Sequence, residues 1–334
     1  MFQEFQCARP AVLQVRVYNG NLTVGYPMTS PISPVAAPAR GLSVVVALAA
    51  VYLIWGSTYL GIRFALEGGY PPLLMAGGRF LLAGSMMYLV LRKRGESAPT
   101  RGQWKNLALM GLLMMGLGNG MVSIAEQWVS SGLAAVAVAS TPLWMGLFSL
   151  ARGQRPSGLE WVGIGIGFVG VLWLNAGSTL SATPAGLVAL LIAPIAWAFG
   201  SIWSKGRDLP TPFMSAAGQM ITGGAMMLVA GGISGESFEA LPTLKGTLAV
   251  IYLMTFGSII GFTAYVWLLH HVRPTLAGSY AYINPAIAVM LGAWLAAEQF
   301  TSHDLGAMAV ILLGVVAITL GKARAPKAAM EATS

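Results

Sequence analysis

The sequence predicts an all-α integral membrane protein whose ten transmembrane helices form two inverted five-helix repeats around a central cavity. Its 334 residues are 56% hydrophobic and 9% charged, whereas a soluble domain carries about 25% charged residues. Apolar stretches follow one another at short intervals, and about 20 apolar residues span the ~30 Å core of a bilayer. A proline-containing stretch near the end also has a weaker copy 143 residues earlier. These observations indicate a membrane protein with an internal duplication.

The ten predicted spans are separated by loops too short for a soluble catalytic or nucleotide-binding domain. We expect them at 42–64, 72–92, 104–126, 132–151, 158–176, 184–204, 212–233, 246–270, 275–297 and 304–321. The first repeat is then expected at residues 41–177 and the second at 183–322, with a cytoplasmic tail at 323–334.

Residues 1–40 are expected to form a disordered cytoplasmic leader. They hold five prolines and no basic start followed by an apolar run, so they do not resemble a signal peptide. Met28 begins a stretch that runs smoothly into the first span and is an alternative start of the chain. The single cysteine, Cys7, lies in this segment, so no intrachain disulfide is expected.

Basic side chains gather in alternate loops, which sets the expected orientation. With the N-terminus in the cytoplasm, Lys245 is the only basic residue of the outer loops, as the positive-inside rule favours. The inner set is Arg40, Arg92, Lys93, Arg94, Arg101, Lys105, Arg152, Arg155, Lys205, Arg207, Arg273, Lys322, Arg324 and Lys327. We therefore expect both termini inside. This distribution also argues against nucleic acid as a partner, despite a net charge of +8.

The duplication centres on residues 279–298, whose earlier copy aligns Pro142 with Pro285, and Gly118 matches Gly261. Because each unit holds an odd number of spans, the second copy enters the membrane from the opposite side, and the repeats are inverted. Each proline removes a backbone hydrogen bond from its helix. Helix breaks at Pro142 and Pro285 are typical of a transporter binding site.

Polar and aromatic residues near the middle of the spans are the candidate substrate-binding residues. Trp and Tyr at this depth differ from the usual interfacial belt and indicate a cavity that stacks aromatic or amphipathic solutes. The alternative for each is core packing with internal hydrogen bonds. Tyr280 and Asn284 share one helix face, and Asn119, between Gly118 and Gly120, is placed to cap a loosened helix. The candidates are Trp55, Tyr59, Arg79, Asn119, Trp197, Tyr280 and Asn284.

The embedded charges need a partner, because an Arg at the bilayer centre costs roughly 2.5–3.5 kcal/mol. Arg79 lies about 10 Å below the outer end of its span, at ~1.5 Å per residue. It is either fixed in an internal ion pair or cap, with Glu126 nearest in depth, or it contacts an anionic group of a substrate. Glu126 is also the candidate for proton coupling. Arg63, Glu126 and Glu298 reach similar outer levels, where contact with headgroups is the alternative.

Six motifs together resemble the EamA family of the drug/metabolite transporter superfamily, and within it the bacterial inner-membrane permeases. They are IWGSTYLGIR (54–63), GGRFLLAG (77–84), GNGMVSIAE (118–126), SSGLAAVAVASTP (130–142), SYAYINP (279–285), and Glu298 with Gly306 and Gly314. The resemblance covers about residues 42–321. It implies ten helices in two inverted repeats and export of small metabolites or drugs. It also implies that Pro142 and Pro285 are paired helix-bending positions and that Glu298 is the acid ending the ninth helix.

The predicted function is a secondary transporter in the cell membrane that exports a small organic metabolite or drug by alternating access. No HExxH, CxxC, GxSxG or P-loop pattern is present, so we expect no enzyme activity, no metal site and no cofactor. Coupling is then expected to an ion gradient, with protons one option. The alternatives are a uniporter or importer, or a non-transporting scaffold or lipid-handling protein. The sequence leaves the solute and the oligomeric state open.

Overall fold

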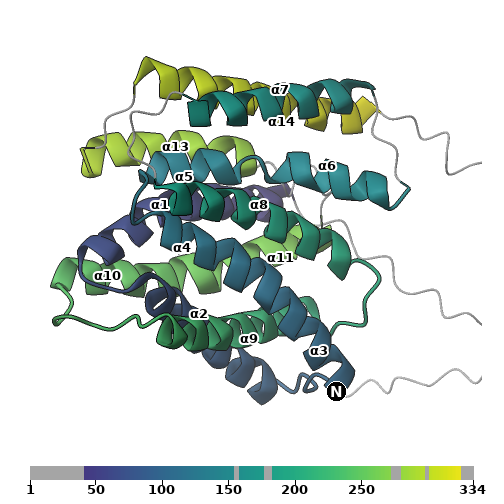
Figure 1. Cartoon of the computed structure of the whole chain (residues 1–334). Helices are drawn as coiled ribbons and strands as arrows, with labels where there is room; N and C mark the ends of the chain where they lie inside the picture. Colours follow the sequence, from purple (N-terminus) through teal and green to yellow (C-terminus); the bar gives the residue numbers. More distant parts are fainter. Residues whose placement is uncertain (1–40, 154–157, 177–182, 272–279, 298–300, 325–334) are drawn as a thin grey trace, which may run out of the picture. The chain divides into compact units, whose positions relative to one another are not determined.

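The computed structural model describes residues 41–153, 158–176, 183–271, 280–297 and 301–324, and every regular element in those ranges is a helix (Figure 1). The first half contains α1 (Gly41–Glu67), α2 (Pro72–Lys93), α3 (Arg101–Met110), η1 (Gly111–Gly120), α4 (Met121–Ala125), α5 (Ser131–Val138), α6 (Thr141–Ala151) and α7 (Gly158–Ala176). The second half contains α8 (Pro184–Ser204), α9 (Pro212–Ile233), α10 (Leu244–Tyr252), η2 (Leu253–Gly261), α11 (Phe262–His271), α13 (Tyr280–Leu295) and α14 (Ser302–Arg324).

Within the described residues, seven helical runs are long and apolar enough to cross a membrane. They are Leu42–Glu67, Pro72–Lys93, Arg101–Ala125, Ser131–Phe148, Pro184–Ser204, Pro212–Ile233 and Leu244–Leu268. Shorter apolar helices cover Ile283–Leu295 and Leu305–Gly314. The long runs coincide with predicted spans to within a few residues, because charges and turn residues end the apolar stretches in both cases.

One long helix in each half changes to a π-helix in its middle. η1 joins α3 to α4 over 10 residues, and η2 joins α10 to α11 over 9 residues. A π-helix is rare and shifts the backbone bond to i+5, and such segments occur frequently at functional sites. Side chains follow the same spacing, since Asn119 Nδ2 donates to the Met114 carbonyl at 3.3 Å and Ser258 Oγ to the Leu253 carbonyl at 3.1 Å. The glycines on both sides of Asn119 therefore do mark a loosened helix.

Helices α2 and α9 pack against each other through glycines. A Cβ atom at Gly77 would lie 2.8 Å from the carbonyl oxygen of Gly224, and one at Gly224 would lie 2.9 Å from the carbonyl oxygen of Gly77. Such distances are shorter than van der Waals contact, so the two backbones approach closely only because neither residue has a side chain. Close approach at small residues is a common way for helices to associate in lipid, where the hydrophobic effect does not drive them together.

Two glutamates link the ends of α2 and α9 in a reciprocal way. Glu236, after α9, accepts hydrogen bonds at the start of α2 from the backbone N–H groups of Leu73 at 3.0 Å and Leu74 at 2.9 Å. Glu96, after α2, accepts from the hydroxyl of Thr211, which itself caps the start of α9. A carboxylate at a helix N-terminus satisfies unpaired donors and stabilises the helix dipole. The start of α2 is thus bonded to Glu236, which follows α9, and the start of α9 is bonded to Glu96, which follows α2.

A second close pair consists of α7 and α14, which lie side by side in Figure 1. A Cβ atom at Gly314 would lie 2.5 Å from the backbone nitrogen of Gly167, so this pair also depends on a missing side chain. α13 packs against α1 and α5 and makes few contacts with α14. The α7–α14 pair therefore has its own glycine interface, separate from that of α2 and α9.

The two paired prolines differ in their surroundings. In the first half, α5 ends at Val138 and α6 begins at Thr141, so the helix is interrupted just before Pro142. In the second half, α13 is continuous from Tyr280 to Leu295 with Pro285 inside it. The interruption expected at Pro285 is therefore absent from residues 280–295. A proline removes one backbone hydrogen bond, and neighbouring helices in a bundle allow the helix to continue past it. Residues 272–279 lie outside the described ranges.

Replacing Gly77 by alanine is expected to destabilise the protein, because its new Cβ would collide with backbone atoms of α9. The neighbouring Gly78→Ala is the matched control, since nothing lies within 4 Å of a Cβ there. Alanine is favoured over glycine in a helix by about 1 kcal/mol. Thermal unfolding in detergent should give a lower Tm for Gly77→Ala and an equal or higher Tm for Gly78→Ala. Equal Tm values for both variants would show that the α2–α9 contact is not tight.

Candidate functional site

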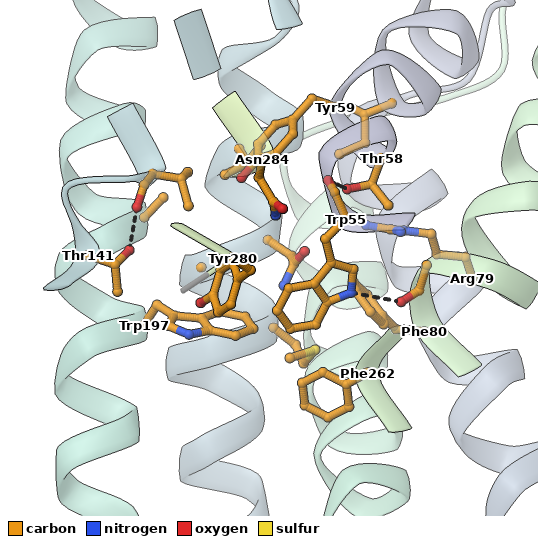
Figure 2. Close-up of a pocket in the computed structure, with 18 residues that line it drawn as sticks. Trp55, Thr58, Tyr59, Arg79, Phe80, Thr141, Trp197, Phe262, Tyr280 and Asn284 are labelled. Carbon is orange, nitrogen blue, oxygen red and sulfur yellow. Dashed lines mark hydrogen bonds between the residues drawn. The ribbon is translucent and has the colours of Figure 1, made fainter. Parts of the chain in front are cut away.

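A pocket lies between the helices and is lined by residues of α1, α2, α4, α5, α6, α8, α11, α13 and both π-helices (Figure 2). We call it the interhelical pocket. Its volume is about 80 Å³, which is room for several water molecules, since one needs ~10–15 Å³. Both halves of the chain contribute to its wall, so its shape depends on how the two halves pack together.

All seven predicted substrate-binding residues line this pocket. They come from five helical segments far apart in the sequence, and the structure brings them to one place. They are Trp55, Tyr59, Arg79, Asn119, Trp197, Tyr280 and Asn284. Their shared location is a finding about geometry, and their contact with a substrate stays a prediction.

Trp55 is the centre of an aromatic cluster on the pocket wall. Its ring lies 4.9 Å from that of Tyr265 and 5.0 Å from that of Tyr280, and its edge-to-face partner Trp197 lies at 6.2 Å. Phe262 is packed against both tryptophans. Tilted and edge-to-face aromatic pairs are favourable by about 0.5–1.5 kcal/mol beyond their buried area. This cluster gives the pocket a rigid apolar side.

Each of the two tryptophans rests on a glycine of the other half. A Cβ atom at Gly118 in η1 would lie 2.9 Å from Cε3 of Trp197, and one at Gly261 in η2 would lie 2.6 Å from Nε1 of Trp55. Trp55 Nε1 also donates to the carbonyl of Gly257 in η2, at 3.2 Å. Both rings therefore take their positions from the π-helices.

Several polar groups of the pocket are already bonded to the backbone. The hydroxyl of Thr58 donates to the Trp55 carbonyl at 2.7 Å, and that of Thr141 donates to the Val138 carbonyl at 2.6 Å. Asn284 is 3% exposed. In the amide orientation that satisfies it, its nitrogen donates to the carbonyls of Tyr280 at 3.2 Å and Tyr52 at 3.3 Å. The bonds of Asn284 thereby link α13 to α1.

Among the described residues that line the pocket, Arg79 is the one with a charged side chain. It is 3% exposed. Its guanidinium lies 4.3 Å from the ring of Phe80. Its Nε has no hydrogen-bond partner, and the ion pairs formed between described residues do not include it. Glu126, at the end of α4 and 6% exposed, lies within electrostatic range of Arg79 and Tyr59 without lining the pocket. The structure thus places the two charges near each other but not in direct contact.

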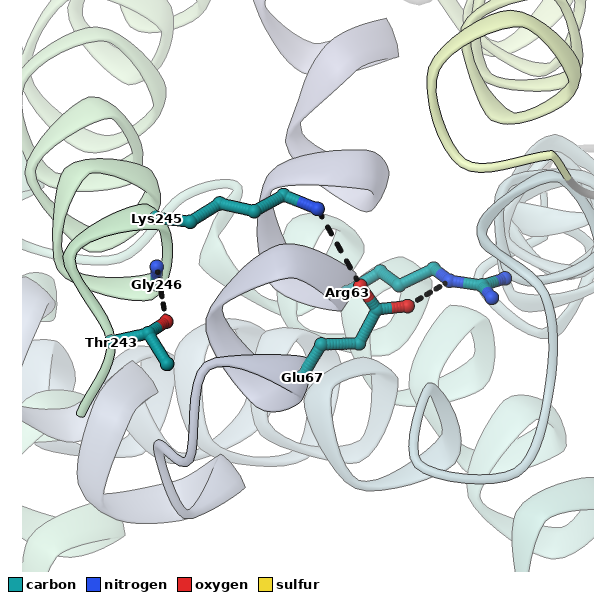
Figure 3. Close-up of polar contacts among 5 residues, drawn as sticks. All are labelled: Arg63, Glu67, Thr243, Lys245 and Gly246. Carbon is teal, nitrogen blue, oxygen red and sulfur yellow. Dashed lines mark hydrogen bonds and ion pairs between the residues drawn. The ribbon is translucent and has the colours of Figure 1, made fainter. Parts of the chain in front are cut away.

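Arg63 points to a different set of partners. Its Nε lies 2.8 Å from Glu67 Oε1, and Lys245 Nζ lies 3.8 Å from Glu67 Oε2. Figure 3 shows both basic side chains beside Glu67. Lys245 also lies 3.6 Å above the ring of Phe64. These contacts tie the end of α1 to the start of α10, outside the interhelical pocket. Glu298, the other predicted rim acid, is outside the described residues.

The structure adds pocket residues that the sequence did not single out. Thr58 and Ile62 follow Trp55 at helical spacing, so the periodicity of α1 could have identified them. Phe80, Met115, Gly257 and Phe262 also line the pocket. Gly257 and Phe262 face it from the region where η2 passes into α11, and ordinary helical periodicity does not apply across a π-helix.

Comparison with known proteins gives a family and a fold. The sequence pattern described as the EamA-like transporter family matches residues 42–176 and 184–320. The chain is 48% identical over 277 residues to "Uncharacterized inner membrane transporter YedA" of Escherichia coli K12, covering 83% of this chain and 90% of that protein. It is 27% identical over 287 residues to "Uncharacterized transporter YvbV" of Bacillus subtilis, covering 84% and 93%. A solved structure, "Crystal structure of protein", aligns with a TM-score of 0.63 at 20% identity over 86% of this chain and all of its own, so it supports the fold alone.

Replacing Trp55 by phenylalanine is expected to lower the free energy of unfolding by about 0.5–1.5 kcal/mol, because the hydrogen bond to the Gly257 carbonyl is lost. Trp161→Phe is the matched control, since Trp161 is 46% exposed. Chemical or thermal unfolding in detergent compares the two. A loss of the same size in both variants would mean that the bond contributes nothing of its own.

Proposed function

The chain belongs to the EamA-like transporter family, and from that premise we propose that it carries a small organic metabolite or drug across the membrane. The solute binds in the interhelical pocket, and the protein acts as a secondary transporter by alternating access. Export is the direction we propose. The location is the bacterial inner membrane, since the E. coli relative is named an inner membrane transporter.

The observation that supports this proposal most is that both family repeats build one pocket. Trp55, Arg79 and Asn119 come from the stretch 42–176, and Trp197, Tyr280 and Asn284 come from the stretch 184–320. A site shared between two repeats can be exposed to either side when one repeat moves against the other. A pocket within a single repeat would not have this property.

We further propose ten crossings in two inverted repeats, with both termini in the cytoplasm. The support is the odd number of spans per repeat in the sequence, the concentration of Lys and Arg in alternate loops, and the matching π-helices η1 and η2. In this arrangement the pocket lies near the middle of the membrane. In this arrangement η1 and η2 occupy equivalent positions in the two repeats, whose helices cross the membrane in opposite directions.

Accessibility from the two sides tests alternating access. In a Cys7→Ser background, single cysteines replace Asn119, Tyr280 or Asn284, which line the pocket. Each should react with an impermeant maleimide added on either side of the membrane. A transported solute should change the ratio of the reaction rates from the two sides. Cysteines at Lys93, at the exposed end of α2, and at Glu239, in an exposed loop, should each react from one side only, with or without solute. The solute comes from a proteoliposome flux screen of amino acids, nucleosides and cationic drugs, with and without a pH gradient. Unchanging reactivity at all three pocket positions, with no flux of any solute, would favour a scaffold or lipid-handling role.

We propose protons as the coupling ion and Glu126 as the group that carries them. This carboxylate is buried, and Arg79 and Tyr59 lie within its electrostatic range. Binding a proton there changes the net charge beside the pocket, so solute affinity should depend on its protonation. The glutamine side chain of Glu126→Gln does not take up or release a proton. The transport rate of this variant should therefore vary much less between pH 5 and 9 than the rate of the wild type. Glu239→Gln, an exposed loop change, should keep the wild-type profile. A wild-type pH profile in Glu126→Gln would exclude the role.

A further inference from the structure

The wall of the interhelical pocket carries a buried positive charge, Arg79, with no carboxylate of the described residues within ion-pair distance. Resting on the proposed function of this pocket, we propose that the transported solute is a small organic monoanion with a flat apolar body. Its acidic group, a carboxylate or a chemically similar group, binds Arg79, and its apolar part packs on the aromatic cluster around Trp55. The proposal rests on Arg79, on the neighbouring polar groups and on the shape of the wall.

Arg79 is a buried cation without a direct contact to an anion of the described residues. At 3% exposure Arg79 is largely removed from water, and burying a charge without an ion-pair partner is strongly unfavourable. Within the described residues no carboxylate lies within 4.0 Å of it, and its Nε has no acceptor. The face of Phe80 compensates in part. The sequence left open an internal ion pair or a substrate anion, and the lack of a direct carboxylate contact favours the anion.

The guanidinium of Arg79 and a carboxylate are complementary in shape and charge. An arginine offers a planar set of donors that matches the two oxygens of a carboxylate. Figure 2 shows Arg79 on one side of the pocket and Trp197 and Tyr280 on the other, with Trp55 between them. A solute that spans this pocket therefore meets a cation at one end and ring faces and edges at the other.

Several other polar groups along the described wall are already bonded to the backbone. The hydroxyls of Thr58 and Thr141 and the amide of Asn119 already donate to backbone carbonyls. Glu126 offsets part of the positive charge from a distance, but it does not line the pocket and so offers no contact to a cationic solute. The volume of about 80 Å³ favours a solute of few atoms. Charge and size together point to a small monoanion.

Three probes that share a phenyl ring and differ in charge test the inference: benzoate, benzamide and benzylammonium. Titration calorimetry on the purified full-length protein in detergent should show benzoate binding at least 10-fold more tightly than either of the others. Arg79→Gln should abolish that preference, and Arg79→Lys should keep part of it, because the charge remains but the planar donor set does not. Arg79→Ala should abolish benzoate flux in proteoliposomes. Arg63→Gln is the matched control, since Arg63 pairs with Glu67 outside the pocket.

The outcomes separate the inference from the proposed function. Benzoate binding with the expected preference, but without flux, would support the anion site and contradict transport. Flux of all three probes at similar rates would support transport and overturn the anion inference, as would equal binding or no binding of the three. Should Arg79→Gln fail to fold, the preference of the wild type and its reduction in Arg79→Lys decide the question.

Discussion

The structure of the pocket depends on two contacts in which a tryptophan of one half packs on a glycine of the other half. Trp55 of α1 lies on Gly261 in η2, and Trp197 of α8 lies on Gly118 in η1. A side chain at either glycine would occupy the place of an indole ring. Because each half supplies the ring that fits the other, the two halves fix each other at the pocket. The edge-to-face contact between Trp55 and Trp197 connects these two tryptophan–glycine contacts.

The π-helices explain why a pocket exists at this point. A π-helix is wider than an α-helix and leaves backbone carbonyls for side chains to bind. Trp55 Nε1 uses one of them, at Gly257, while Asn119 and Ser258 bind carbonyls five residues back in their own helices. These bonds satisfy groups that lipid cannot satisfy. Arg79 is the exception, because it is a buried donor group without a direct anionic partner among the described residues. For that reason it is the residue that we propose binds an anionic group of the solute.

Outside the pocket, glycine contacts and helix-end acids hold the helices together. The Gly77–Gly224 approach brings α2 and α9 together, and Glu236 and Glu96 fasten their ends. The α7–α14 pair repeats the use of glycine without sharing that interface. In a membrane, where burial of apolar surface gives no driving force between helices, such close backbone contacts and satisfied helix ends carry the specificity. The helix pairs outside the pocket therefore meet at glycines, whereas large aromatic side chains form one side of the pocket.

The sequence by itself determined the class of the protein, the places of the long helices and seven of the residues that line one pocket. Hydropathy and embedded polar residues have a strong physical meaning in a chain without a water-soluble core. It did not determine that η1 and η2 are π-helices, that α13 continues through Pro285, or that Gly257 and Phe262 face the pocket. Nor did it decide whether Arg79 has an internal ion pair. Those features depend on which residues meet across the two halves, and only the packed structure brings them within contact distance.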